Sequence, residues 1–392
     1  MSQVDFDVFD ADNHYYEATD AFTRHIDPRL AKRAMQWAQI DGKERLIVGG
    51  RVNRFIPNPR FDPIARPGCL DDYFRGRSPA DDIRGAFGQL EPIRDAYRDR
   101  DARVVAMDEQ GLAGCFLFPT LGVGMEEALV GDPDAAHAAF RAFNRWLDED
   151  WGLHHAERLF AAPYLTLLDP DQALDEARWA VENGARIVVL RAGPVMAPTG
   201  GRSPGDQLYD PVWAALAAAG ITVAYHSGEA GYGRYLVDWG ESAEFEAFRR
   251  TPLYGLLTSD RAISDTVAAL ICHGVFDRHP TLRVATIESG SEWVHPLVKK
   301  LAKSHSMTPG AFASDPVDQL RRHVWVAPYY EDDIRHLVDS IGVGHVLFGS
   351  DWPHAEGLAD PTSFVHDLVG FTDDEVRRIM HDNADALSRP PG

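Results

Sequence analysis

Eight short apolar runs rich in β-branched residues recur along this chain, and helical patterns lie between them. This alternation is typical of βαβ units, in which helices join buried parallel strands. Eight is the number of strands that a closed parallel barrel requires. The sequence therefore predicts an α/β fold, a (β/α)₈ TIM barrel, in preference to an open doubly wound sheet. The predicted strands are Asp7–Asn13, Leu112–Phe118, Leu159–Thr166, Ala185–Leu190, Ile221–His226, Leu282–Glu288, His323–Ala327 and His345–Gly349.

Helix start and stop signals separate several of these runs. Asp169-Pro170-Asp171 is expected to open a helix that ends near Asn183-Gly184, and Tyr209-Asp210-Pro211 to open one that ends at Gly220. A proline in the first turn and a glycine just after the last turn are typical of helix ends. Because each glycine comes just before the next predicted strand, we expect short connections back to the barrel.

Two long segments interrupt the regular spacing, residues 17–78 after the first predicted strand and residues 227–264 after the fifth. The first contains FIPNPRFDPIARPGC, which suits neither a helix nor a core strand, and the second is rich in Gly, Tyr and acidic residues. Both follow strand ends, where loops build the active-site face of a barrel, so we expect them to cap a pocket. A linker between two domains is the alternative, but we interpret residues 1–392 as one domain.

The net charge and the cysteine content limit the binding partners and the cellular compartment that we expect. The 39 Lys and Arg face 60 Asp and Glu, which gives a formal net charge of -21. Such a surface repels phosphate backbones and anionic headgroups, so we expect a small-molecule substrate and neither nucleic acid nor membrane as a partner. The start, MSQVDFDVFDADNH, lacks the pattern of a signal peptide, and a cytoplasmic protein is expected. Cys69, Cys115 and Cys272 are expected to be reduced and buried.

Polar residues lie at the carboxyl ends of several predicted strands, and in a barrel those ends meet at one mouth. Asp12 and His14 end the first run two residues apart, so their side chains face the same side. His226 ends the fifth run, Glu288 ends the sixth, and Asp351 follows the eighth. Imidazoles with carboxylates suit Zn²⁺, Mn²⁺ or Fe²⁺. Each residue alone could be a hydrogen-bonding residue at the barrel mouth, but together they favour a metal site.

Four blocks carry a resemblance to a known family. They are Asp10-Ala-Asp-Asn-His14, His226-Ser-Gly, the stretch from Gly274 to Trp293 that includes Ile287-Glu-Ser-Gly290, and Leu347-Phe-Gly-Ser-Asp-Trp-Pro-His354. The chain resembles the amidohydrolase superfamily, in the branch of aminocarboxymuconate semialdehyde decarboxylase and of the resorcylate and carboxyvanillate decarboxylases. The resemblance implies a metal-dependent TIM-barrel enzyme, a homodimer, and one divalent metal, zinc before manganese or iron. The implied ligands are Asp12, His14, His226 and Asp351.

The chain departs from the family pattern in three places. Asp12 stands where many members have a histidine, and Glu288 stands where several of the decarboxylases carry one. No lysine lies between Lys43 and Lys299, so the carbamylated lysine that bridges two metals in other branches is absent. The departures favour a mononuclear site and weaken the transfer of the decarboxylase mechanism.

The expected reaction is therefore hydrolysis of an amide, lactone or related carbonyl bond, with Asp351, Glu288 and His354 as the catalytic residues. Non-oxidative decarboxylation of an aromatic or unsaturated carboxylate by the same residues is the close alternative, and a barrel that binds a ligand without chemistry is the third. Further polar and aromatic residues follow strand ends and are expected to contact the substrate. They are Arg191, Trp293, Trp352 and Tyr329. Three histidines, at 273, 279 and 323, precede strands and are expected to be structural.

Overall fold

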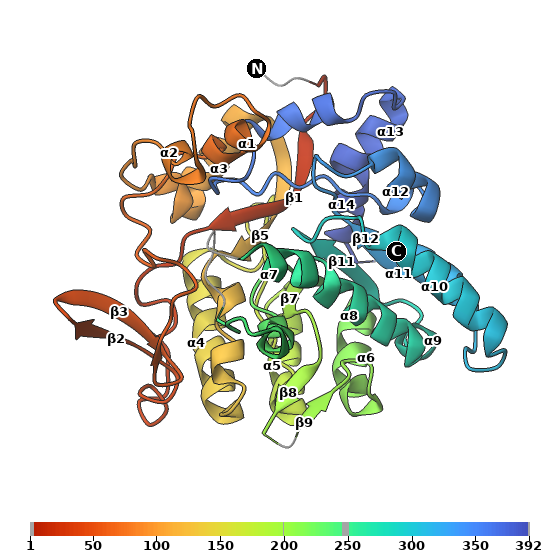
Figure 1. The fold of residues 1–392 in the computed structure, drawn as a ribbon, viewed down its shortest axis with the longest axis horizontal. Helices are drawn as coiled ribbons and strands as arrows, with labels where there is room; N and C mark the ends of the chain where they lie inside the picture. Colours follow the sequence, from red (N-terminus) through yellow and green to blue (C-terminus); the bar gives the residue numbers. More distant parts are fainter. Residues whose placement is uncertain (1–3, 199, 245–250, 391–392) are drawn as a thin grey trace.

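The computed structural model describes residues 4–198, 200–244 and 251–390, and its centre is a ring of parallel strands with helices outside (Figure 1). The strands form two parallel sheets, in the order β1-β5-β6 and β12-β11-β10-β7. The bounds of the barrel strands are β1 Val8–Tyr15, β5 Leu112–Pro119, β6 Leu159–Ala161, β7 Ile187–Arg191, β10 Thr222–His226, β11 Arg283–Ile287 and β12 Val324–Val326.

Single parallel bridges join the two sheets into a closed barrel. Tyr164 pairs with Val189 between β6 and β7, and Val326 pairs with Val346 beyond β12. The last gap closes where Asn13 of β1 pairs with Trp352. The predicted fold class, an α/β TIM barrel, is thus confirmed.

Two of the eight predicted strands differ from the expectation, because other groups take their backbone hydrogen bonds. The run His345–Gly349 is buried but forms only the Val346 bridge, since the Phe348 amide donates to Ile379 O at 3.0 Å. In the run Leu159–Thr166, β6 ends at Ala161. Beyond that point Asn144, on helix α4 (Pro133–Asp150), supplies the hydrogen bonds. Its side chain donates to Tyr164 O at 2.9 Å and accepts from Tyr164 N at 2.8 Å.

Helices follow the strands, and the start and stop signals place two of them correctly. Helix α5 begins at Pro170 after the cap Asp169, and α6 ends at Ala219 before Gly220, whose φ is 67°. Helices α4, α5 and α6 lie side by side in Figure 1. The longer helices are α3 Arg100–Gln110, α4 Pro133–Asp150, α5 Pro170–Glu182, α6 Asp210–Ala219, α8 Arg261–Cys272, α10 Val294–Met307, α11 Pro316–His323 and α12 Ile334–Ile341.

Shorter elements fill the connections. The short α-helices are α1 Cys69–Phe74, α2 Ile83–Ala86, α7 Pro252–Thr258, α9 Val275–Arg278, α13 Asp373–Arg377 and α14 Asn383–Leu387. The strands outside the barrel are β2 Met35–Ile40, β3 Lys43–Val48, β4 Arg51–Val52, β8 Val195–Ala197 and β9 Gly200–Arg202. The remaining helical turns are η1 Asp95–Tyr97, η2 Gly122–Gly124, η3 Glu127–Leu129, η4 Gln207–Tyr209, η5 Tyr232–Trp239, η6 Val343–His345, η7 Pro361–Asp367 and the π-helical η8 Arg378–Asp382.

The first insertion, residues 17–78, contains a β-hairpin that the sequence analysis did not predict. Strands β2 and β3 pair antiparallel around Asp41-Gly42, which have φ values of 51° and 71°, and the hairpin stands out from the barrel in Figure 1. An Asp-Gly pair between two strands is a strong hairpin signal, and it was present in the sequence. In the second insertion, residues 227–264, the structure shows η5 and α7, while residues 245–250 lie outside the described residues, as do the ends of the chain at 1–3 and 391–392.

Two further observations concern the surface and the cysteines. No helix within the described part of the chain is both long and apolar enough to cross a membrane. All three cysteines are free; Cys69 and Cys115 are buried as expected, but Cys272 is exposed because it is the last residue of α8.

Replacing Asn144 tests how the interrupted third strand is held. We expect Asn144→Ala to lower the free energy of unfolding by about 2–4 kcal/mol, because it leaves the buried N–H and C=O of Tyr164 without their partner. Urea unfolding measures this, with the exposed Glu182→Ala as the control. A decrease in the free energy of unfolding below about 0.5 kcal/mol would show that the two hydrogen bonds from Asn144 to Tyr164 are not needed.

Candidate metal centre

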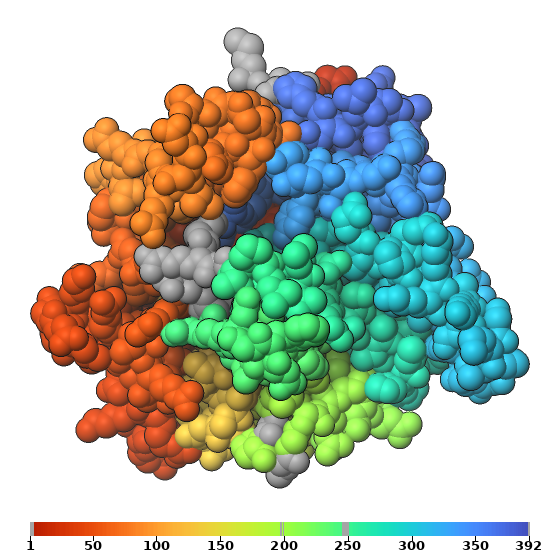
Figure 2. Space-filling model, viewed as in Figure 1, coloured from red at the N-terminus to blue at the C-terminus, as the bar shows by residue number. Residues whose placement is uncertain are grey.

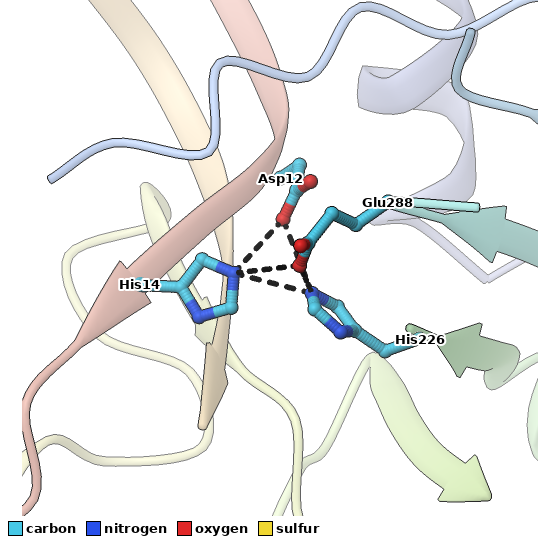
Figure 3. A group of neighbouring side chains, drawn as sticks. All are labelled: Asp12, His14, His226 and Glu288. Carbon is cyan, nitrogen blue, oxygen red and sulfur yellow. Dashed lines mark hydrogen bonds and ion pairs between the residues drawn. The ribbon is translucent and has the colours of Figure 1, made fainter. Parts of the chain in front are cut away.

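Four side chains from three barrel strands converge at the mouth of the barrel. Asp12 and His14 come from β1, His226 ends β10, and Glu288 directly follows β11. Figure 3 shows that these side chains point toward one another. Each offers one nitrogen or oxygen atom, and these atoms all lie within 4.8 Å of one another. This group is therefore compact enough to hold one metal ion.

The distances within the group centre on two imidazole nitrogens. Nε2 of His14 lies 3.1 Å from Nε2 of His226, and both lie close to Asp12 Oδ1, at 3.2 Å and 3.4 Å. Glu288 Oε2 lies 3.4 Å from His226 Nε2 and 4.0 Å from His14 Nε2. His226 Nδ1 lies 2.8 Å from the carbonyl oxygen of Ser227, which can only accept, so Nδ1 carries the proton. The lone pair of His226 is thus on Nε2, as a metal ligand requires.

Asp351 lies at the edge of this group. Its Oδ1 is 3.3 Å from His14 Nε2, but its compact groupings are with His14 and His354 and with Glu288 and Glu356. The sequence analysis placed Asp351 in the ligand set and Glu288 outside it. The structure brings three of the predicted ligands together and adds Glu288 as the fourth member, because Glu288 follows the strand next to His226.

The charges of the centre fit a bound cation. Burial and the neighbouring Asp351 raise the pKa of Glu288 well above its usual value, and burial and Glu356 do the same to the pKa of Asp351. Burial would also raise the pKa of Asp12, but hydrogen bonds from His14 and His226 outweigh it and lower that pKa. Carboxylates crowded in this way repel one another, and a divalent cation among them would relieve the repulsion.

The backbone holds two of the acids in an unusual conformation. Glu288 and Asp351 have positive φ values of 49° and 55°, in the left-handed region that costs a non-glycine residue about 1–2 kcal/mol. The Asp351 amide donates to Asp12 O at 2.8 Å, which ties the loop after the eighth run to β1. Such strained positions tend to occur at functional sites.

Asp10 is a positioning residue whose role the sequence analysis missed. Its buried carboxylate accepts from the amides of Asp12 at 3.1 Å and Ser350 at 2.9 Å. It also accepts from the Asn13 side chain at 2.8 Å and the Ser350 hydroxyl at 2.5 Å. Burial raises its pKa to about 7 in spite of these donors. The repeat Asp-x-Asp-x-His was the available signal, but only its second Asp faces the metal centre.

A chain of close polar contacts connects Asp351 to the barrel wall through His354. The Thr120 hydroxyl donates to Tyr15 O at 2.8 Å, so it accepts from His354 Nε2, which lies 2.9 Å away. His354 Nδ1 then faces Asp351 Oδ1 at 2.6 Å. This is an ion-pair distance, although neither atom makes a hydrogen bond. His354 therefore reaches the mouth next to Asp351, where the sequence analysis expected it.

The four residues predicted to contact a substrate are placed differently. Arg191 is buried and pairs with Glu127 at 2.6 Å and Glu126 at 3.7 Å, so its charge is already neutralised. Trp293 and Trp352 are buried in the core, and neither lines the pocket at the metal centre. Tyr329 does line that pocket, and its hydroxyl donates to Glu288 O at 2.6 Å.

The three histidines expected to be structural all have partners away from the centre. His273 contacts the Ser203 hydroxyl, His279 contacts Asp210, and His323 contacts Leu282 O. None of them belongs to a metal-binding group among the described residues.

A cavity of about 950 Å³ opens from the metal centre to the surface. The first insertion supplies much of its apolar wall, including Phe55, Phe61 and Phe74, whereas Ser227 and Gly228 are its lining residues from the described part of the second. In the space-filling view the surface is hollowed where the N-terminal and C-terminal segments meet (Figure 2). This volume lies at the upper end of the range for small-molecule sites.

Comparisons with known proteins agree with this architecture. The family model described as amidohydrolase matches residues 82–388. The crystal structure of an amidohydrolase from Mycobacterium avium subsp. paratuberculosis K-10 is similar at 46% identity, 98% coverage of both chains and a TM-score of 0.93.

Two decarboxylases are similar in fold at lower identity. The 2,6-dihydroxybenzoate decarboxylase from Rhizobium has 19% identity, a TM-score of 0.59, and coverage of 83% of this chain and 96% of that one. The 5-carboxyvanillate decarboxylase from Novosphingobium aromaticivorans, complexed with manganese and 4-hydroxy-3-methoxy-5-nitrobenzoic acid, has 16% identity, a TM-score of 0.60, and coverage of 98% and 96%.

Gly349 offers a steric test of the centre. A Cβ at this position would lie 2.5 Å from Asp12 Cβ, so Gly349→Ala must displace Asp12. We expect Gly349→Ala to weaken Mn²⁺ or Zn²⁺ binding at least about tenfold while the protein stays folded, as calorimetry and circular dichroism will measure. Gly344→Ala is the matched control, because a Cβ there meets nothing within 4 Å. Equal metal affinity in both variants would show that Asp12 is not a ligand.

Proposed function

The chain belongs to the amidohydrolase family, and from that premise we propose that it is a metal-dependent decarboxylase of aromatic or unsaturated carboxylates. The observation that carries the proposal is the 2.6 Å approach of His354 Nδ1 to Asp351 Oδ1 beside the metal-binding group, at one end of a largely apolar cavity. Non-oxidative decarboxylation needs a group that holds a carboxylate and an acid that donates a proton to carbon. The likeness in fold to two decarboxylases favours this reaction over hydrolysis.

We propose that Asp12, His14, His226 and Glu288 hold the metal and that Asp351 is the acid. A divalent cation bound there would hold the substrate's carboxylate and an adjacent hydroxyl and would offset the negative charge of the acids. Nitrogen and carboxylate ligands suit Mn²⁺ as well as Zn²⁺, so both ions are candidates. Asp351 at the edge of the group remains free to face a substrate carbon.

The proton moves in a balanced sequence. Asp351, in its protonated form beside His354 Nδ1, donates its proton to the substrate carbon that bears the carboxylate. The bond between that carbon and the carboxylate then breaks, its electron pair stays on the carbon, and CO₂ leaves. Asp351 regains a proton from solvent, and His354, held by Thr120, keeps its carboxylate oriented. The apolar walls exclude water from the charged intermediate.

Hydrolysis is the second candidate, and Glu288 is the residue that favours it. It gives the centre a carboxylate where the resemblance led us to expect a histidine. Its side chain is about one quarter exposed toward the cavity, at 25%. A carboxylate at that place could accept a proton from an attacking water instead of binding the metal.

The test is CO₂ release from a panel of carboxylates by the Mn²⁺-loaded and Zn²⁺-loaded protein. The panel starts from 2,6-dihydroxybenzoate and 5-carboxyvanillate, and parallel assays use aryl amides and lactones. We expect CO₂ release that Asp351→Asn lowers at least about 100-fold without loss of bound metal, because the ligand group does not need Asp351.

The exposed Asp339→Asn is the matched control and should leave CO₂ release unchanged. Turnover of amides or lactones with no CO₂ from any carboxylate would replace decarboxylation by hydrolysis. Loss of the bound metal in Asp351→Asn would show that Asp351 is a metal ligand.

A further inference from the structure

The two ends of the large cavity differ in charge. Its inner end carries the acids of the metal centre, and Glu331 and Glu356 also line it. Among the described residues that line the cavity, Arg84 is the one arginine, and no lysine occurs. Arg84 lies on the short helix α2 in the segment after the first insertion, and it is exposed, whereas the metal centre is buried.

Within the part of the chain that the structure describes, Arg84 has no acidic partner. No ion pair or hydrogen bond joins its guanidinium to any residue in the described parts of the chain. Three other arginines of the same region are paired, Arg66 with Asp72, Arg75 with Asp71 and Asp367, and Arg94 with Glu91, whereas Arg77 is unpaired among the described residues but does not line the cavity. In a chain with a formal net charge of -21, a cation without a partner at the mouth of a cavity is available to a ligand.

The surroundings of Arg84 are apolar. Ile83 and Phe87 line the cavity beside it, and Phe74 and Leu90 do so while 48% and 47% exposed. Large apolar side chains that remain exposed around a cavity mark a surface that contacts a ligand. Among the residues that the structure describes, the cavity thus offers a ligand a metal centre, an apolar wall and one guanidinium.

The cavity is also much larger than one aromatic ring needs. At about 950 Å³ it would leave a single-ring carboxylate bound at the metal centre far from filling it. An elongated molecule would bury more apolar surface against Phe55, Phe61 and Phe74.

We infer that Arg84 binds a second anionic group of the substrate, which is therefore an elongated dicarboxylate with an apolar body. The inference rests on the proposed function, since the first carboxylate occupies the metal centre. Guanidinium and carboxylate pair well through two parallel hydrogen bonds, so Arg84 selects for the distal anion. The residue determines specificity and takes no part in the bond-breaking step.

The test compares affinities of the Mn²⁺-loaded protein for carboxylates of matched length. The probes are linear dicarboxylates from adipate to dodecanedioate, each against the monocarboxylate of the same chain length. We expect the wild type to bind at least one dicarboxylate about fivefold more tightly than the monocarboxylate of the same chain length. This exceeds the statistical factor of about two that a ligand with two equivalent ends would show. Isothermal titration calorimetry measures both.

Arg84→Gln should abolish this preference and leave the monocarboxylate affinity unchanged. Arg77→Gln is the matched control, because Arg77 lies nearby, is exposed and does not line the cavity. Two results would overturn the role of Arg84 and leave the proposed function standing. One is equal affinity of the wild type for dicarboxylates and monocarboxylates, and the other is an equal loss of the dicarboxylate preference in Arg84→Gln and Arg77→Gln. If no carboxylate binds the Mn²⁺-loaded protein, the proposed function itself fails.

Discussion

Repulsion between buried carboxylates is the constraint on which the rest of this site depends. Asp12, Glu288, Asp351 and Glu356 fall into overlapping groups at the barrel mouth, and burial makes the negative charge of Glu288 and Asp351 costly. Two features of the site offset this cost: the imidazoles and the metal-binding geometry at the centre, and the ion pair of Asp351 with His354 at the edge. Asp10 and its four donors then fix the two backbone segments that carry Asp12 and Asp351.

Much of this arrangement could be predicted from the sequence, because strand periodicity places residues at the barrel mouth. Asp12, His14 and His226 end regular strands, so their convergence follows from the fold. Glu288 and Asp351 lie just past strand ends in left-handed conformations, and such local geometry decides which of them joins the ligand group. Periodicity does not determine that geometry, so the sequence did not indicate that Glu288 lies in one compact group with Asp12, His14 and His226.

The remaining differences have the same origin. Arg191, Trp293 and Trp352 follow strands, but their partners come from distant segments: Glu126 and Glu127 for the arginine, and the core for the tryptophans. The cavity wall comes from the first insertion, whose Pro-rich stretch has no regular pattern to interpret. The sequence thus predicts the strand-end residues of the metal-binding group better than the wall of the cavity.

Metal binding by the purified protein tests the central claim most directly. Mass spectrometry and titration with Mn²⁺ and Zn²⁺ would be run on the wild type, on His226→Ala and on His273→Ala, whose histidine is exposed and contacts Ser203 instead of the centre. The account predicts about one equivalent in the wild type and in His273→Ala, and affinity at least about 100-fold weaker in His226→Ala. Failure of the wild type to bind either ion, or equal binding by all three proteins, would contradict it.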